Sequence, residues 1–100
     1  RFEIENDINL SISKSEIIYT DVWASMGQED QENQRKLDFK NYQLTPDHIE
    51  KNNAFFMHDL PAHHGDEITE NLVDHPNSIV FEQSENRIWG QLGIIKKIVE

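Results

Sequence analysis

The sequence contains no cysteine, no long apolar run and few basic residues, with 9 Lys and Arg against 19 Asp and Glu among 100 residues. Without cysteine there is no disulfide framework, which fits a reducing compartment, and we expect a cytoplasmic protein. No apolar run is long enough to span a bilayer, and the acidic balance repels anionic lipid, so a membrane partner is not expected. The formal charge of −10 repels phosphate backbones, so nucleic acid is not an expected partner either. The acidic balance suits a cationic ligand, but ordinary surface solubility explains it equally well.

The apolar residues make up 36% of the chain and are clustered, which is typical of a small folded domain. Four short apolar segments are predicted to be strands, at residues 2–4, 17–20, 53–57 and 78–81. The second is a continuous run of β-branched and aromatic residues, which is typical of a strand buried on both faces.

Helices are predicted at residues 8–13, 28–40, 45–52 and 84–100. Asp7 and Thr45 are the expected N-caps of the first and third, and Pro46 is the expected first residue of the third. A further short helix is expected after Thr69. Strands that alternate with helices predict an α/β fold, with a partial parallel sheet of about four strands and flanking helices.

Three of the predicted strands run directly into polar segments. Residues 17–20 lead into Asp21 and a Ser25-Met26-Gly27 sequence, residues 53–57 lead into residues 58–65, and residues 78–81 lead into residues 82–87. In open α/β sheets, ligands bind at the carboxyl ends of the strands. We therefore expect the three strand ends to build one site.

Two charged residues are candidates for ligand contacts at these strand ends. Asp21 is placed to hold an ammonium group, although an Asp that closes its strand with a local turn hydrogen bond is the more frequent situation. With Ser84 as N-cap, Arg87 would lie in the first turn of the last helix, where free N–H groups and a guanidinium suit a phosphate. An ion pair between Arg87 and Glu85 or a neighbouring carboxylate is an equally good interpretation.

No metal or cofactor is expected. The spacing of His58, His63, His64 and Asp66 matches no usual zinc pattern, and adjacent loop histidines rarely bind one ion together. The sequence also contains no nucleotide-binding glycine pattern.

Taken together, the segments Tyr19-Thr20-Asp21-Val22-Trp23-Ala24-Ser25-Met26-Gly27-Gln28-Glu29, Phe56-Met57-His58-Asp59-Leu60-Pro61-Ala62-His63 and Val80-Phe81-Glu82-Gln83-Ser84-Glu85-Asn86-Arg87 resemble ornithine carbamoyltransferases in order and spacing. The resemblance covers nearly the whole chain. It implies that residues 1–100 are the C-terminal portion of the family's Rossmann-like, ornithine-binding domain.

The resemblance implies a fragment of a homotrimeric enzyme of arginine metabolism, which converts carbamoyl phosphate and L-ornithine to L-citrulline and phosphate. The family's Ser-x-Arg-Thr-Arg and His-Pro-x-Gln motifs belong to the carbamoyl-phosphate domain and are absent here, so the isolated chain is not expected to catalyse. Two alternatives remain open: a paralogue that acts on another amine, and a non-catalytic amino-acid-binding module.

The resemblance also implies residue roles. Ornithine would be contacted by Asp21, Ser25 and Met26. Carbamoyl phosphate would be contacted by Arg87 and by the backbone around Asp59 and Leu60. Asp59 is also the candidate catalytic position, because it stands where the family usually has the cysteine of its His-Cys-Leu-Pro motif. A carboxylate there repels phosphate and favours a protonated, non-nucleophilic amine.

Overall fold

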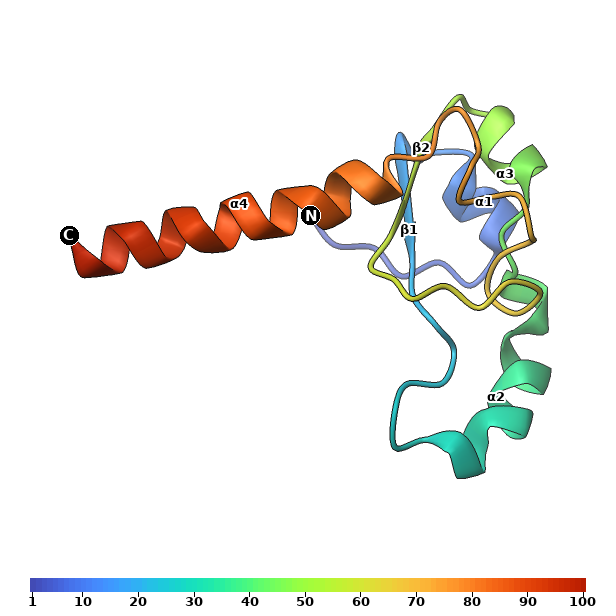
Figure 1. Ribbon diagram of the computed structural model, residues 1–100. Helices are drawn as coiled ribbons and strands as arrows, with labels where there is room; N and C mark the ends of the chain where they lie inside the picture. The colour runs from blue at the N-terminus through green and yellow to red at the C-terminus, as the bar shows by residue number, and fades with distance from the viewer.

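The computed structural model describes all residues 1–100, which form a small body from which one long helix projects (Figure 1). In chain order the elements are α1 (Ile8–Ile12), β1 (Ile17–Thr20), η1 (Glu29–Gln31), α2 (Glu32–Phe39), η2 (Lys40–Tyr42), α3 (Pro46–Glu50), β2 (Phe55–His58) and α4 (Val80–Val99), where η marks a 3-10 helix. β1 and β2 pair in parallel, with Ile17 opposite Phe55 and Thr20 opposite His58. The predicted α/β class with parallel strands is confirmed.

The sheet contains two strands, so the prediction of about four is wrong in number. Residues 2–4 are exposed and form no strand. Ser78 makes a single parallel bridge to Phe56, and the Ile79 N–H donates to the Phe56 carbonyl at 2.9 Å, but Val80 already begins α4. A short apolar run fits a buried helix start as well as a strand, and here the helix forms, with Val80 fully buried.

The local signals for two helices are confirmed. The Asp7 carboxylate caps α1 by accepting hydrogen bonds from the N–H groups of Asn9 and Leu10, at 2.9 and 3.2 Å. Pro46 is the first residue of α3, and the Thr45 N–H donates to His48 Nδ1 at 3.1 Å. The prediction of a short helix after Thr69 is wrong, because that segment consists of turns.

The core consists of ten buried apolar residues, drawn from both strands, three of the helices, the loops on either side of α3 and the turns between β2 and α4: Ile12, Ile18, Leu44, Ile49, Ala54, Phe56, Ile68, Leu72, Val73 and Val80. Phe56, on β2, is fully buried, and Ile18 is the buried residue of β1. These contacts fix the two strands relative to each other, and with them the loops that follow the strands.

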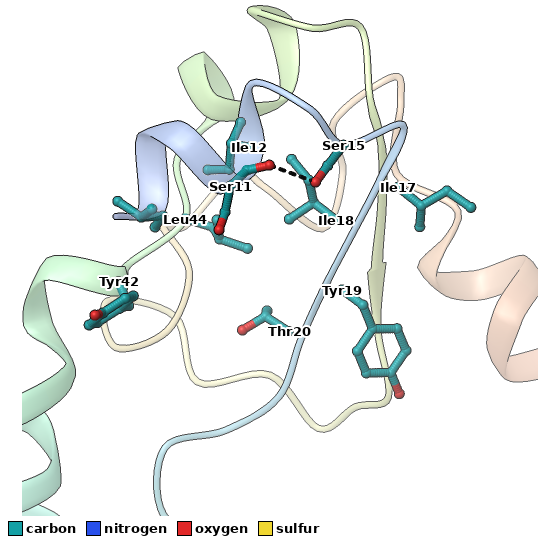
Figure 2. Close-up of a pocket in the computed structure, with 10 residues that line it drawn as sticks. Ser11, Ile12, Ser15, Ile17, Ile18, Tyr19, Thr20, Tyr42 and Leu44 are labelled. Carbon is teal, nitrogen blue, oxygen red and sulfur yellow. Dashed lines mark hydrogen bonds between the residues drawn. The ribbon is translucent and has the colours of Figure 1, made fainter. Parts of the chain in front are cut away.

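The prediction that β1 is buried on both faces is wrong. Ile17 and Tyr19 are 55% and 54% exposed, whereas Ile18 is 8% exposed. In Figure 2 the side chains of Ile18 and Thr20 point to the side of β1 on which α1 and Leu44 lie, while those of Ile17 and Tyr19 point to the other side. The side chains on that second side are thus about half exposed.

α4 begins four residues before the expected Ser84, and its far part stands clear of the body (Figure 1). Its apolar residues are correspondingly exposed; Ile88, Leu92, Ile95 and Val99 range from 51% to 76%. The lysines Lys96 and Lys97 lie in the last turn, where cations suit the helix dipole.

None of the helices is both long enough and apolar enough to span a membrane.

Candidate functional site

The ends of β1 and β2 bring two polar segments to one edge of the sheet. Thr20 and His58 are paired residues, and Asp21 and Asp59 follow them directly. Because the strands are parallel, the loop of residues 21–29 (the 21–29 loop) and the turn of residues 58–61 (the 58–61 turn) leave the same edge. The prediction that strand ends assemble is confirmed for these two.

Asp21 is exposed, and one of its carboxylate oxygens accepts a hydrogen bond from the Val22 N–H at 2.6 Å. This is the local turn hydrogen bond that was the alternative interpretation of Asp21. It occupies Oδ1 only, and the structure assigns Oδ2 no partner. The carboxylate can therefore close the strand and still accept a hydrogen bond from a cationic ligand.

The Ser25-Met26-Gly27 segment is a turn closed by its own hydrogen bonds. The Gln28 N–H donates to the Ser25 carbonyl at 3.1 Å, and Gly27 adopts a φ of 85°, which a glycine adopts without strain. Hydrogen bonds from the backbone N–H groups of Glu29 and Gly27 lower the pKa of the Glu29 carboxyl below its usual range. The turn leaves the side chains of Ser25 and Met26 exposed, with Met26 97% accessible to solvent.

The 58–61 turn is organised by His58, which is 1% exposed. His58 Nδ1 accepts a hydrogen bond from the Leu60 N–H at 2.9 Å, so the proton of a neutral imidazole lies on Nε2. Leu60 has a φ of 55°, and its peptide bond to Pro61 is cis. The Asp59 side chain is 41% exposed.

Glu67 supports the 58–61 turn through hydrogen bonds, and the sequence analysis did not identify it as a candidate residue. It is fully buried, and its Oε1 accepts hydrogen bonds from His58 Nε2 at 2.9 Å and from the His63 N–H at 2.7 Å. Its Oε2 is buried without a partner. The segment has no regular secondary structure, so no periodicity marked Glu67 as buried, and sequence reasoning selected its neighbour Asp66 instead.

The first turns of α4 also contact the end of β2, next to the 58–61 turn. Gln83, also missed by sequence reasoning, accepts a hydrogen bond from the His58 N–H through Oε1 at 3.1 Å. Arg87 lies four residues further, on the same face of α4 and one turn from Gln83. It is exposed, and neither Glu85 nor another carboxylate forms an ion pair with it.

The helix-terminus argument for Arg87 is wrong. α4 begins at Val80, so Ser84 is an interior residue and not the N-cap. The backbone N–H groups near Arg87 are therefore used within the helix, and what Arg87 brings to an anion is its guanidinium. His63 and His64 are exposed, and no three His, Cys, Asp or Glu side chains are grouped so that they could hold a metal ion.

The sequence and the fold both match known proteins. Residues 1–98 match the family model described as aspartate/ornithine carbamoyltransferase, Asp/Orn binding domain. The chain is 43% identical to an ornithine carbamoyltransferase of Oceanobacillus iheyensis over 97% of its own length and 31% of the relative's. It is 40% identical to the anabolic ornithine carbamoyltransferase of Pyrococcus furiosus, over 98% and 32% of the two lengths.

Solved structures agree with these matches. The ornithine carbamoyltransferase of Pyrococcus furiosus superposes with a TM-score of 0.77 and 42% identity, over 89% of this chain and 29% of that one. The enzyme of Burkholderia thailandensis superposes with a TM-score of 0.76 and 28% identity, over 94% of this chain and 29% of that one. The chain thus spans about a third of the length of the relatives it matches. It belongs to the aspartate/ornithine carbamoyltransferase family.

Proposed function

We propose that this chain is part of an ornithine carbamoyltransferase and supplies the ornithine loop and one side of the carbamoyl-phosphate site. The observation that carries the proposal is the register of β1 and β2, which brings the 21–29 loop and the 58–61 turn to one edge of the sheet. The names of the matched relatives support ornithine as the amine and carbamoyl phosphate as the carbamoyl donor.

Ornithine is bound in this proposal by the 21–29 loop. Asp21 carries a negative charge and a carboxylate oxygen without a protein partner, which suits the α-ammonium group. The exposed side chains of Ser25 and Met26 contact the amino-acid end, with the Ser25 hydroxyl supplying a hydrogen bond. The φ of Gly27 allows the backbone to turn at that point.

Carbamoyl phosphate is bound in this proposal between the 58–61 turn and α4. The Leu60 N–H already donates to His58, so the backbone group available there is the Leu60 carbonyl, which can accept from the carbamoyl amide. Arg87 donates to the phosphate oxygens. The buried pair of His58 and Glu67 keeps this turn in place before the substrate arrives.

In the proposed reaction the neutral δ-amine of ornithine attacks the carbamoyl carbon. A carbon–nitrogen bond forms, the carbon–oxygen bond to phosphate breaks, and the amine loses a proton, giving citrulline and phosphate. Positioning and charge stabilisation carry the rate rather than a covalent intermediate. Asp59, next to His58, is the side chain of this turn that can accept a hydrogen bond from the attacking amine.

The proposal is tested by incubating the full-length protein with ornithine and carbamoyl phosphate and measuring citrulline. We expect citrulline from the full-length protein and none from the isolated 100-residue chain. Ornithine binding without citrulline would instead indicate a non-catalytic binding module, and faster turnover of a different amine would contradict the substrate assignment.

Replacing Asp59 by Asn should lower the KM for carbamoyl phosphate about tenfold. At about 6 Å and an effective dielectric constant of about 20, two unit charges interact by roughly 3 kcal/mol, and solvent exposure reduces this to about 1–2 kcal/mol. Asn keeps the shape of the side chain and removes its charge. Steady-state kinetics with each substrate varied in turn measure the two KM values and kcat.

The companion variant is Asp59→Cys, which restores the residue of the family motif. We expect it to lower the same KM and also to raise kcat, because the amine is no longer held as an ammonium by a carboxylate. If both variants lose activity, Asp59 is an adapted catalytic group and the charge-repulsion argument is wrong.

The proposal includes a homotrimer and a role in arginine biosynthesis, which rest on the family resemblance, and a cytoplasmic location, which rests on a sequence without cysteine. Sedimentation of the full-length protein measures the assembly: a trimer mass supports the proposal, and a monomer contradicts it.

A further inference from the structure

Two consecutive residues of helix α2 contact the 21–29 loop and the segment of residues 65–67 that supports the 58–61 turn. Arg35 Nη1 donates a hydrogen bond to the Trp23 carbonyl, in the 21–29 loop, at 3.1 Å. Lys36 Nζ lies 3.1 Å from Asp66 Oδ2, next to Glu67. Successive side chains on a helix point about 100° apart, so one short helix can contact two different segments in this way.

The contact with the 21–29 loop has a second component. The Trp23 ring stacks on Phe39, near the end of α2, with centroids 6.3 Å apart and an interplanar angle of 30°. Arg35 is half-buried and forms no ion pair with a carboxylate, although the chain carries a formal charge of −10. Its other contact is with Gln31 Oε1 at 3.5 Å. The guanidinium therefore holds the backbone of this loop.

The contact with the other segment is also reinforced. Gln43, just after η2, donates from Nε2 to the carbonyls of Gly65 and Asp66, both at 2.8 Å. The Leu44 N–H donates to the Glu67 carbonyl at 2.9 Å. Residues 65–67 are thus held by hydrogen bonds to Gln43 and Leu44, which follow α2 in the chain. Glu67 in turn accepts hydrogen bonds from His58 and from the His63 N–H.

Lys36 stays positively charged in this arrangement. Its ammonium group lies 2.8 Å from Glu32 Oε1 as well as 3.1 Å from Asp66 Oδ2. The hydrogen bonds with Glu32 and Asp66 raise the pKa of Lys36 above its usual value.

We propose that Arg35 and Lys36 are positioning residues that couple the two substrate segments through α2. The path runs from the 21–29 loop through Trp23 and Arg35 to α2, and from Lys36 through Asp66 and Glu67 to His58 in the 58–61 turn. The inference rests on the proposed function, because it assumes that ornithine binds at the first segment and carbamoyl phosphate at the second. Each residue then affects the substrate bound at the far segment.

The test is made in the full-length protein with Lys36→Met and Arg35→Met. Lys36→Met removes a contact on the carbamoyl-phosphate side, yet we expect it to raise the KM for ornithine about 5- to 20-fold, within the usual range of coupling between sites. Arg35→Met should raise the KM for carbamoyl phosphate by a similar factor. In the double variant the effects should be less than multiplicative, because either change alone interrupts the path.

Two further variants separate coupling from general charge effects. Lys40→Met removes the same charge at the end of α2 from a lysine that forms no ion pair, and both KM values should stay within about twofold. Lys36→Arg should restore the ornithine KM, because it keeps the charge next to Asp66. The proposal is overturned if Lys36→Met changes only the carbamoyl-phosphate KM, or behaves as Lys40→Met does.

Amide hydrogen exchange tests the same path without turnover. The Leu60 N–H is held by His58, and the Gln28 N–H by the Ser25 carbonyl. In ligand-free Lys36→Met, exchange should be faster at both positions, and in Lys40→Met at neither. If exchange in Lys36→Met is faster at both positions but the unmodified full-length protein forms no citrulline, the coupling stands and the proposed function is contradicted. Unchanged exchange at Gln28 would contradict the coupling.

Discussion

Replacing Glu67 with Ala is expected to lower the free energy of unfolding by about 3–5 kcal/mol, because it leaves two donors without an acceptor, at about 1–3 kcal/mol each, and opens a cavity. Glu67 is fully buried and accepts hydrogen bonds from His58 Nε2 and from the His63 N–H. Alanine would leave both donors without a partner and open a cavity beneath the 58–61 turn. Urea unfolding of the chain, followed by tryptophan fluorescence, measures the change.

Glu70→Ala is the matched control, because Glu70 is exposed and makes no side-chain hydrogen bond. Its free energy of unfolding should change by less than about 0.5 kcal/mol. Glu67→Gln keeps the Oε1 acceptor and the volume, so its loss should be smaller than that of Glu67→Ala. Equal stability of the Glu67→Ala and Glu70→Ala variants would show that the buried carboxylate does not hold the turn.

Replacing Asp21 with Asn in the full-length protein is expected to raise the KM for ornithine about 30-fold. A hydrogen bond to a charged group contributes about 1.5–3 kcal/mol, and each 1.4 kcal/mol corresponds to a factor of ten. Asn can still accept from the Val22 N–H through Oδ1, so the local turn is preserved and the charge alone is removed. The KM for carbamoyl phosphate should change by less than about threefold, which steady-state kinetics in both substrates will show.

Asp30→Asn serves as the control for Asp21→Asn. Asp30 lies in η1 and is exposed. Its replacement by Asn removes the same charge from a neighbouring part of the chain. Its ornithine KM should stay within about twofold of the unmodified protein. If the two variants give the same ornithine KM, Asp21 only closes the end of β1 and does not bind the substrate ammonium.

The local elements were predictable where a short-range pattern had a single interpretation. The Asp7 cap, the Thr45-Pro46 start of α3, and the strands at Ile17–Thr20 and Phe55–His58 each depend on residues within one turn or one strand. The segment of residues 78–81 had two interpretations. Val80, fully buried, begins a helix there, and its burial is not visible in the local sequence.

The sequence by itself determined the family, the parallel α/β character, and the two polar segments that carry Asp21 and Asp59, because motifs and strand patterns are properties of adjacent residues. Tertiary structure alone decided that Glu67 is the buried support of His58, that Gln83 reaches the end of β2, and that Arg87 lies in the interior of α4. These facts depend on contacts between residues 9 and 25 positions apart and on where a helix begins. Such contacts form only when the core brings the segments together, since burial is a property of the packed chain and not of any one stretch of it.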